Sequence, residues 1–141
     1  MRTRYLLLPL GVAVAASAAA HHSFSAEFDA SKPVTLHGTI LRMEWINPHS
    51  WLHIAVKNPD GTTSEWMIEA ATPNTLFRRG YTKDAVKAGT EITVEGYRAK
   101  NGANRANGRD MILPDGSRLF MGSAGTGAPG ENAPGGASSE Q

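Results

Sequence analysis

Four of the five histidines form two close pairs: His21 with His22 near the amino end, and His49 with His53 further along the chain. Histidine is the commonest metal ligand in proteins. The chain has no cysteine, which excludes thiolate catalysis and cysteine-type zinc sites. A set of three nitrogen ligands suits the tetragonal preference of copper(II). The four histidines are therefore the candidate ligands of a copper site.

The first twenty residues have the features of an export signal. Arg2 and Arg4 supply the positive start, residues 5–16 form an apolar run, and residues 17–20 are small, as a signal peptidase requires. The apolar run is too short to span a membrane. We therefore expect residues 1–20 to be a signal peptide and the protein to be periplasmic or secreted, with no cysteine to carry a lipid and no stable membrane insertion after cleavage.

The cleavage site decides which chelate the first histidine pair can form. Cleavage after Ala20 would make His21 the amino terminus. The α-amine has a pKa of about 7.7 to 8, against about 10.4 for a lysine, so it can deprotonate near neutral pH and bind the same metal as its own imidazole. One further imidazole, from His49 or His53, would complete a three-nitrogen set.

A cut after Ala19 would give a different chelate. The chain would begin Ala20-His21-His22, and the amine, two backbone amide nitrogens and the His22 imidazole could surround copper or nickel in a square plane. In the domain, His49 and His53 would lie about 13 Å apart on a regular strand, at roughly 3.3 Å per residue. One of these two, rather than both, is the easier partner for His21.

A structural interpretation competes with the metal hypothesis. The first pair would then be solvated chain end, while His49 and His53 would cap a turn and cover a sheet rim beside Trp51. The alternative function is a binding module for a partner protein or for a small anionic or sugar ligand. Four residues would bind the ligand: Trp51, His53, Arg98 and Lys100. No nucleophile elbow, phosphate loop or His-Glu-x-x-His motif is present, so we expect no enzymatic activity in either case.

The rest of the sequence predicts a mainly β domain. Strands are expected at 34–45, 51–57, 63–70, 91–99, 111–113 and 118–120, with a loop at 101–108. The alternation of the first strand slips near Gly38, which indicates a bulge. A helix should begin at Pro73, capped by Thr72, and end before Gly80. This order favours a small five-stranded barrel of the oligonucleotide/oligosaccharide-binding (OB) type, with one short helix between strands 3 and 4, over an open sandwich.

The composition indicates where the domain begins and ends and which classes of partner it could bind. We expect the domain at 21–120 and a disordered Gly/Ala/Ser/Pro-rich tail at 121–141. Without residues 1–20 the chain has 12 basic and 13 acidic residues. This near-neutral charge argues against a nucleic-acid partner and against a polybasic membrane binder. A periplasmic protein partner remains compatible with it.

Three motifs resemble a family of small exported bacterial proteins known only as a domain of unknown function. They are His21-His22-Ser23-Phe24, the stretch from Glu44 to Trp51, and Glu95 to Lys100 followed by Asn107-Gly108-Arg109. The resemblance implies export and a small β domain. It brings no established activity, substrate or catalytic residue.

Overall fold

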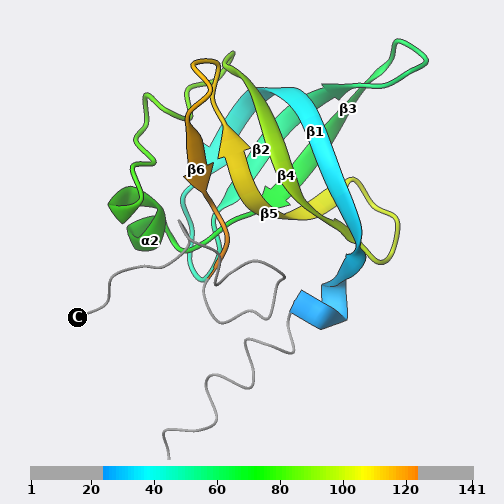
Figure 1. Ribbon diagram of the computed structural model, residues 1–141, viewed down its shortest axis with the longest axis horizontal. Coiled ribbons are helices and arrows are strands. Elements are labelled where there is room, and N and C mark those ends of the chain that lie inside the picture. The colour runs from blue at the N-terminus through cyan, green and yellow to red at the C-terminus, as the bar shows by residue number, and fades with distance from the viewer. Residues whose placement is uncertain (1–23, 124–141) are drawn as a thin grey trace, which may run out of the picture.

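The domain is built almost entirely from strands (Figure 1). The computed structural model describes residues 24–123. Its elements are a helical turn at residues 24–27, β1 (Phe28–Glu44), β2 (Trp51–Lys57), β3 (Thr63–Glu69), α2 (Pro73–Arg78), β4 (Glu91–Ala99), β5 (Arg105–Ile112) and β6 (Arg118–Phe120). The prediction of a mainly β domain is confirmed. Within these residues, no helix is both long and apolar enough to span a membrane.

The six strands form one sheet in the order β3-β2-β1-β4-β5-β6. Consecutive strands of this order run antiparallel, and a short parallel pairing of β3 with β5 joins the ends of a five-strand set. Hydrogen bonds therefore form a ring through β1, β2, β3, β5 and β4. The length of β1, 17 residues, allows it to pair with both β2 and β4.

The core fills the inside of this ring. Side chains alternate between the two faces of a strand, so every second residue points inward. Leu52 and Ile54 of β2, Ile68 of β3, Val94 of β4 and Met111 of β5 are fully buried. The intervening residues of each strand form the outer face of the sheet, where the candidate site lies.

The short helix follows its sequence signals. Pro73 is in the first turn of α2, and Oγ1 of Thr72 accepts a hydrogen bond from the backbone N–H of Thr75 at 3.3 Å. Gly80 follows the helix with a φ of +92°, a conformation that favours glycine. The predicted cap, start and end of the helix are confirmed.

Two predicted boundaries were wrong. β1 begins at Phe28 rather than Val34, with an irregular register between Phe28 and Pro33. The predicted loop at 101–108 is shorter, because β5 begins at Arg105 and pairs with β4 on one side and β3 on the other. β3 and β4 supply backbone hydrogen-bond partners on both sides of β5, which is why its polar and small residues are extended. All six expected strands join one sheet, which differs from the predicted five-stranded barrel. The helix at residues 24–27 was not predicted, so the domain has two short helices instead of one.

The bulge in β1 lies slightly later than predicted. The register with β2 shifts between Ile40 and Arg42, so Leu41 is the extra residue. Gly38 has a different function: a Cβ there would lie 2.7 Å from the backbone oxygen of Ala55. The glycine therefore permits close approach of β1 and β2, while the bulge bends the strand three residues later.

Both ends of the described chain are packed onto the sheet. Phe24, Phe28, Tyr97 and Ala99 form a small buried cluster, with the Phe24 ring edge-on to Tyr97 at 5.7 Å. The two buried phenylalanines anchor the amino-terminal segment to the sheet. Met121 is fully buried and its backbone N–H donates to Arg109, so the packed domain includes it. The predicted signal peptide and most of the predicted tail lie outside residues 24–123.

Candidate functional site

His49 is held in a fixed orientation by a carboxylate. It lies in the turn between β1 and β2, which is tied to the segment after β3 by backbone bonds between Ser50 and residues 70 and 71. Its Nδ1 forms a short hydrogen bond with Oε1 of Glu69. Glu69 is the last residue of β3, opposite Trp51 in β2. The exposed fractions of the two side chains are 27% for His49 and 11% for Glu69, so part of the imidazole reaches solvent while the carboxylate is nearly covered.

The electrostatic surroundings favour a protonated His49. Its pKa is raised above the ordinary value of 6.5, chiefly by the hydrogen bond to Glu69, with burial opposing and the charges of Glu69 and Glu27 adding to the rise. Glu27 belongs to the helical turn at the amino-terminal end of the described chain. The amino-terminal segment therefore lies within electrostatic range of His49.

Arg105 connects this segment to the outer face of the sheet. Its guanidinium lies 4.8 Å above the ring of Trp51, and its Nη2 is 3.4 Å from Oε2 of Glu27. The backbone N–H of Lys100 donates to the Glu27 carbonyl at 2.9 Å, and its Nζ donates to the carbonyl of Ser25. Residues from the turn, β2 and β5 are thus gathered on one side of the domain.

The His49–Glu69 pair should make stability depend on pH. Because the folded-state pKa of His49 is raised, its contribution is fully present below the unfolded value near 6.5 and is lost as the pH rises through the folded value. We expect His49→Gln to remove about 1 kcal/mol of stability at low pH and little at high pH. Urea unfolding of the metal-free parent protein and variant, at pH values below and above 6.5, measures this difference in unfolding free energy. His37→Gln is the control, because His37 is exposed and bonded to a neutral hydroxyl. Its free energy of unfolding should depend on pH as that of the parent protein does. If both variants changed this dependence equally, the effect would not come from the His49–Glu69 pair.

His53 has a different environment from His49. It is only 2% exposed, and its Nδ1 lies 2.7 Å from Oε1 of Glu65. Its Nε2 lies 3.1 Å from Oε1 of Glu44, within ion-pair range but without hydrogen-bond geometry. We regard this second contact as electrostatic, since the distance is short and the alignment poor. Arg42 contacts both carboxylates, at 3.0 Å to Glu65 and 3.4 Å to Glu44. Both nitrogens of His53 thus face carboxylates, and the ring is covered.

The other predicted ligand-binding residues, Arg98 and Lys100, contact groups other than Trp51 and His53. Arg98 lies 5.2 Å over the ring of Trp66 and donates to the carbonyl of Gly102. Trp66 faces the core, on the opposite face of the sheet from Trp51. Lys100 bonds to the amino-terminal turn, as described above. The cation that covers Trp51 is instead Arg105.

Sequence reasoning missed three site residues: Glu27, Glu69 and Arg105. The hairpin turn at 58–61 fixes the register that places Glu69 across from Trp51, so this carboxylate could have been found from the sequence. Arg105 falls in the predicted loop and Glu27 in no predicted element, and each has a partner from a distant part of the chain. His21 and His22 lie outside the described residues. Within residues 24–123, no group of three or more acidic or histidine side chains is arranged to hold a metal ion.

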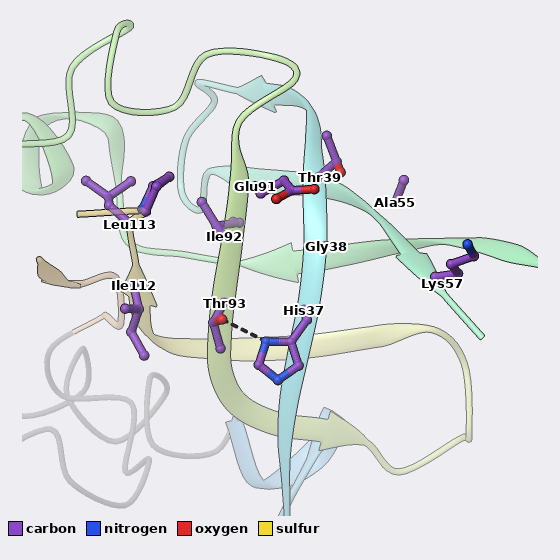
Figure 2. Close-up of a pocket in the computed structure, with 11 residues that line it drawn as sticks. His37, Gly38, Thr39, Ala55, Lys57, Glu91, Ile92, Thr93, Ile112 and Leu113 are labelled. Carbon is purple, nitrogen blue, oxygen red and sulfur yellow. Dashed lines mark hydrogen bonds between the residues drawn. The ribbon is translucent and has the colours of Figure 1, made fainter. Parts of the chain in front are cut away.

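A separate groove lies on the outer face of β1, β2 and β4, at the end of β5 (Figure 2). Its volume is about 600 Å³, within the usual range for small-molecule sites. Nδ1 of His37 lies 2.8 Å from Oγ1 of Thr93. Lys57 and Glu91 bring one charge of each sign to the lining, and Ile112 and Leu113 give it an apolar side. The groove is distinct from the surface around His49.

The comparison with protein families identifies a family of unknown function. The model of a family of unknown function, DUF6152, matches residues 10–108. No curated protein matches the chain.

Proposed function

The chain belongs to this family of unknown function, and we propose that it is an exported, non-enzymatic copper-binding domain whose ligands are the amino-terminal His21 and the imidazole of His49. One observation carries the proposal: Nδ1 of His49 is held by the Glu69 carboxylate. Metal-binding histidines almost always donate their second ring N–H to a carboxylate, carbonyl or water, which fixes the ring and raises its basicity. This arrangement leaves Nε2 of His49 as the nitrogen for a metal.

We infer that the amino-terminal segment can reach His49. Phe24 is packed on Tyr97, and the charge of Glu27 acts on His49. The three residues from Phe24 back to His21 can span up to roughly 10 Å when extended. The α-amine and imidazole of His21, together with Nε2 of His49, would then form the three-nitrogen set that suits copper(II).

His49 is a better candidate than His53 for the third nitrogen. Glu65 and Glu44 face both nitrogens of His53, and its ring is 2% exposed. A metal could reach it only if these contacts were broken. His22 remains the alternative ligand for a chain cut after Ala19, in which copper would be held without any residue of the domain.

We also propose that the ring of strands is an OB-type barrel. The closed path β1–β2–β3–β5–β4, with α2 between β3 and β4, supports this finer description. The bulge at Leu41 and the close approach at Gly38 give β1 the bend that a small barrel needs. Such a barrel provides a rigid surface for the turn that carries His49.

Copper titration of the processed protein tests the proposal. With His21 verified as the amino terminus by mass spectrometry, we expect one copper(II) per chain by calorimetry and a nitrogen-rich paramagnetic resonance spectrum. His49→Ala should lower the affinity at least about tenfold, and Glu69→Gln by a similar factor through loss of orientation. His37→Ala is the matched control and should bind like the parent protein. Equal affinity in His49→Ala and the parent would contradict the role of His49.

A binding module for a small anionic or sugar ligand is the second candidate. The groove of Figure 2 supports it, because His37 and Lys57 could hold an anion while Thr39 and Thr93 offer hydroxyls. Binding at this groove would be insensitive to chelators and to His49→Ala, but would be lost in His37→Ala/Lys57→Ala. A thermal-shift screen of sugars and small carboxylates with these two variants distinguishes the two candidates.

A further inference from the structure

The exposed large apolar side chains lie along one seam of the domain. Within residues 24–123 they are Leu41, Ile46 and Phe77, with exposed fractions of 40%, 49% and 49%. Two are on β1 or the turn after it, and the third is on α2. A soluble surface tolerates single exposed apolar residues, whereas a contiguous set marks an interaction site.

Two contacts show that the segments carrying these residues adjoin. At one end, the ring of Phe77 stacks on Trp45 with centroids 4.7 Å apart and an interplanar angle of 18°. At the other end, the backbone N–H of Gly89 donates to the carbonyl of Ile40 at 2.8 Å, and that of Ile40 donates to Thr90 at 2.9 Å. Residues 77–89 therefore run alongside residues 40–46. We call the surface formed by residues 41–46 and 77–87 the seam.

The α2 side of the seam carries most of its charge. Residues 77–87 contain four basic residues, Arg78, Arg79, Lys83 and Lys87, against one acidic residue, Asp84. Arg79 is already engaged, with its guanidinium 4.7 Å over Phe120 and bonded to the Gly122 carbonyl. The other three cations are exposed.

These three cations have no anionic partner within the described part of the chain. None of the ion pairs found between residues 24 and 123 includes Arg78, Lys83 or Lys87. Most other arginines of the sheet are paired, for example Arg42 with Glu65 and Arg118 with Glu95. The seam thus combines exposed apolar side chains with free positive charge, although the chain as a whole is nearly neutral.

We propose that the seam docks the protein on an anionic lipid surface, with Ile46 and Phe77 entering the headgroup region and Arg78, Lys83 and Lys87 contacting lipid phosphates. Aromatic and aliphatic side chains beside cations are the combination that interfacial binding uses. A stable protein interface involves about 20–30 residues on each side, whereas the seam has 17, six at 41–46 and eleven at 77–87. Shallow insertion into a lipid surface needs only a few such side chains, and the charge fits anionic headgroups.

Vesicle flotation tests this inference with the full chain exported and processed from its own leader. We expect binding to vesicles of phosphatidylcholine with phosphatidylglycerol, weak binding to phosphatidylcholine alone, and release at about 0.5 M salt, where charges are screened within a few ångströms. Ile46→Ser/Phe77→Ser should lower partitioning at least about tenfold. Arg78→Gln/Lys83→Gln/Lys87→Gln should lower binding to the anionic vesicles roughly a hundredfold.

The matched control removes three exposed lysines outside the seam: Lys32→Gln/Lys57→Gln/Lys100→Gln. It should bind the anionic vesicles almost as well as the parent protein, and circular dichroism should show that all variants are folded. Absence of binding to anionic vesicles, or an equal loss in the control, would overturn the proposal. So would a concentration-dependent association in solution that Ile46→Ser/Phe77→Ser abolishes, because the seam would then be an interface between proteins.

Discussion

Gly96→Ala is expected to lower the free energy of unfolding by more than about 4 kcal/mol, a large fraction of the 5–15 kcal/mol typical of a domain. A Cβ at this position would lie 2.2 Å from the backbone oxygen of Asn107 and 3.1 Å from its carbonyl carbon. Asn107 pairs with Tyr97 in β4 and with Glu69 in β3. Because β5 is held on both sides, its backbone cannot move away without breaking the ring of strands.

The same substitution at Gly102 provides the control. Gly102 has a φ of +77° and open space where a Cβ would be. Gly102→Ala should therefore cost only about 1 kcal/mol, from the left-handed conformation alone. Urea unfolding followed by tryptophan fluorescence compares the two variants. If Gly96→Ala were no less stable than Gly102→Ala, the close approach of β4 and β5 would not be a requirement of the fold.

A three-residue extension, Met-Gln-Gln, placed before His21 is expected to reduce copper affinity at least about a hundredfold. It leaves no histidine in the third position, whereas a single added residue would put His22 there and recreate the square-planar chelate. The α-amine of His21 would become an amide, which removes a nitrogen that binds the metal directly. Removal of a direct ligand should lower copper affinity by more than the 10–100-fold that is typical when a group that only orients a ligand is mutated. The variant can be made by intracellular expression without the leader and compared, by copper titration, with protein that begins at His21. Equal affinity of the two proteins would contradict the amino-terminal site.

Combining this extension with His49→Ala separates the two possible chelates. If the amine and imidazole of His21 act with His49, each change alone should weaken binding, and the second should add little to the first. If the mature chain begins at Ala20, the three-residue extension moves His22 from the third to the fifth position and should weaken binding, while His49→Ala should have no effect. These patterns differ even when the total loss of affinity is similar.

The local part of the fold was predictable from the sequence. Pro73, Thr72 and Gly80 determined the helix, and the turn at 58–61 determined the hairpin of β2 and β3, since these signals act within a few residues. The start of β5 was not predictable. Asn107 and Gly108 have low strand propensity, and they are extended because β3 and β4 supply hydrogen bonds from distant parts of the chain.

The candidate site was predictable only in its residue types. His49 and His53 are alike in the sequence, yet Glu69 orients one ring while Glu44, Glu65 and Arg42 enclose the other. This difference arises from cross-strand neighbours, which depend on register. The contact of Glu27 with Arg105 depends on how the amino-terminal turn packs on Tyr97, a tertiary contact that composition and spacing do not encode.

The pairing of β1 with β4 has a consequence for the order in which the chain folds during synthesis. Phe28 pairs with Ala99, whereas β2 and β3 are neighbours in sequence. The meander of β1, β2 and β3 can form early, but its two outer strands stay unpaired until β4 and β5 have been made. Proteins dominated by such distant pairings fold in milliseconds to seconds. Under the proposed export route, this delay gives the translocation machinery time to engage an extended chain, and premature termination before residue 105 would release a sheet with two aggregation-prone edges.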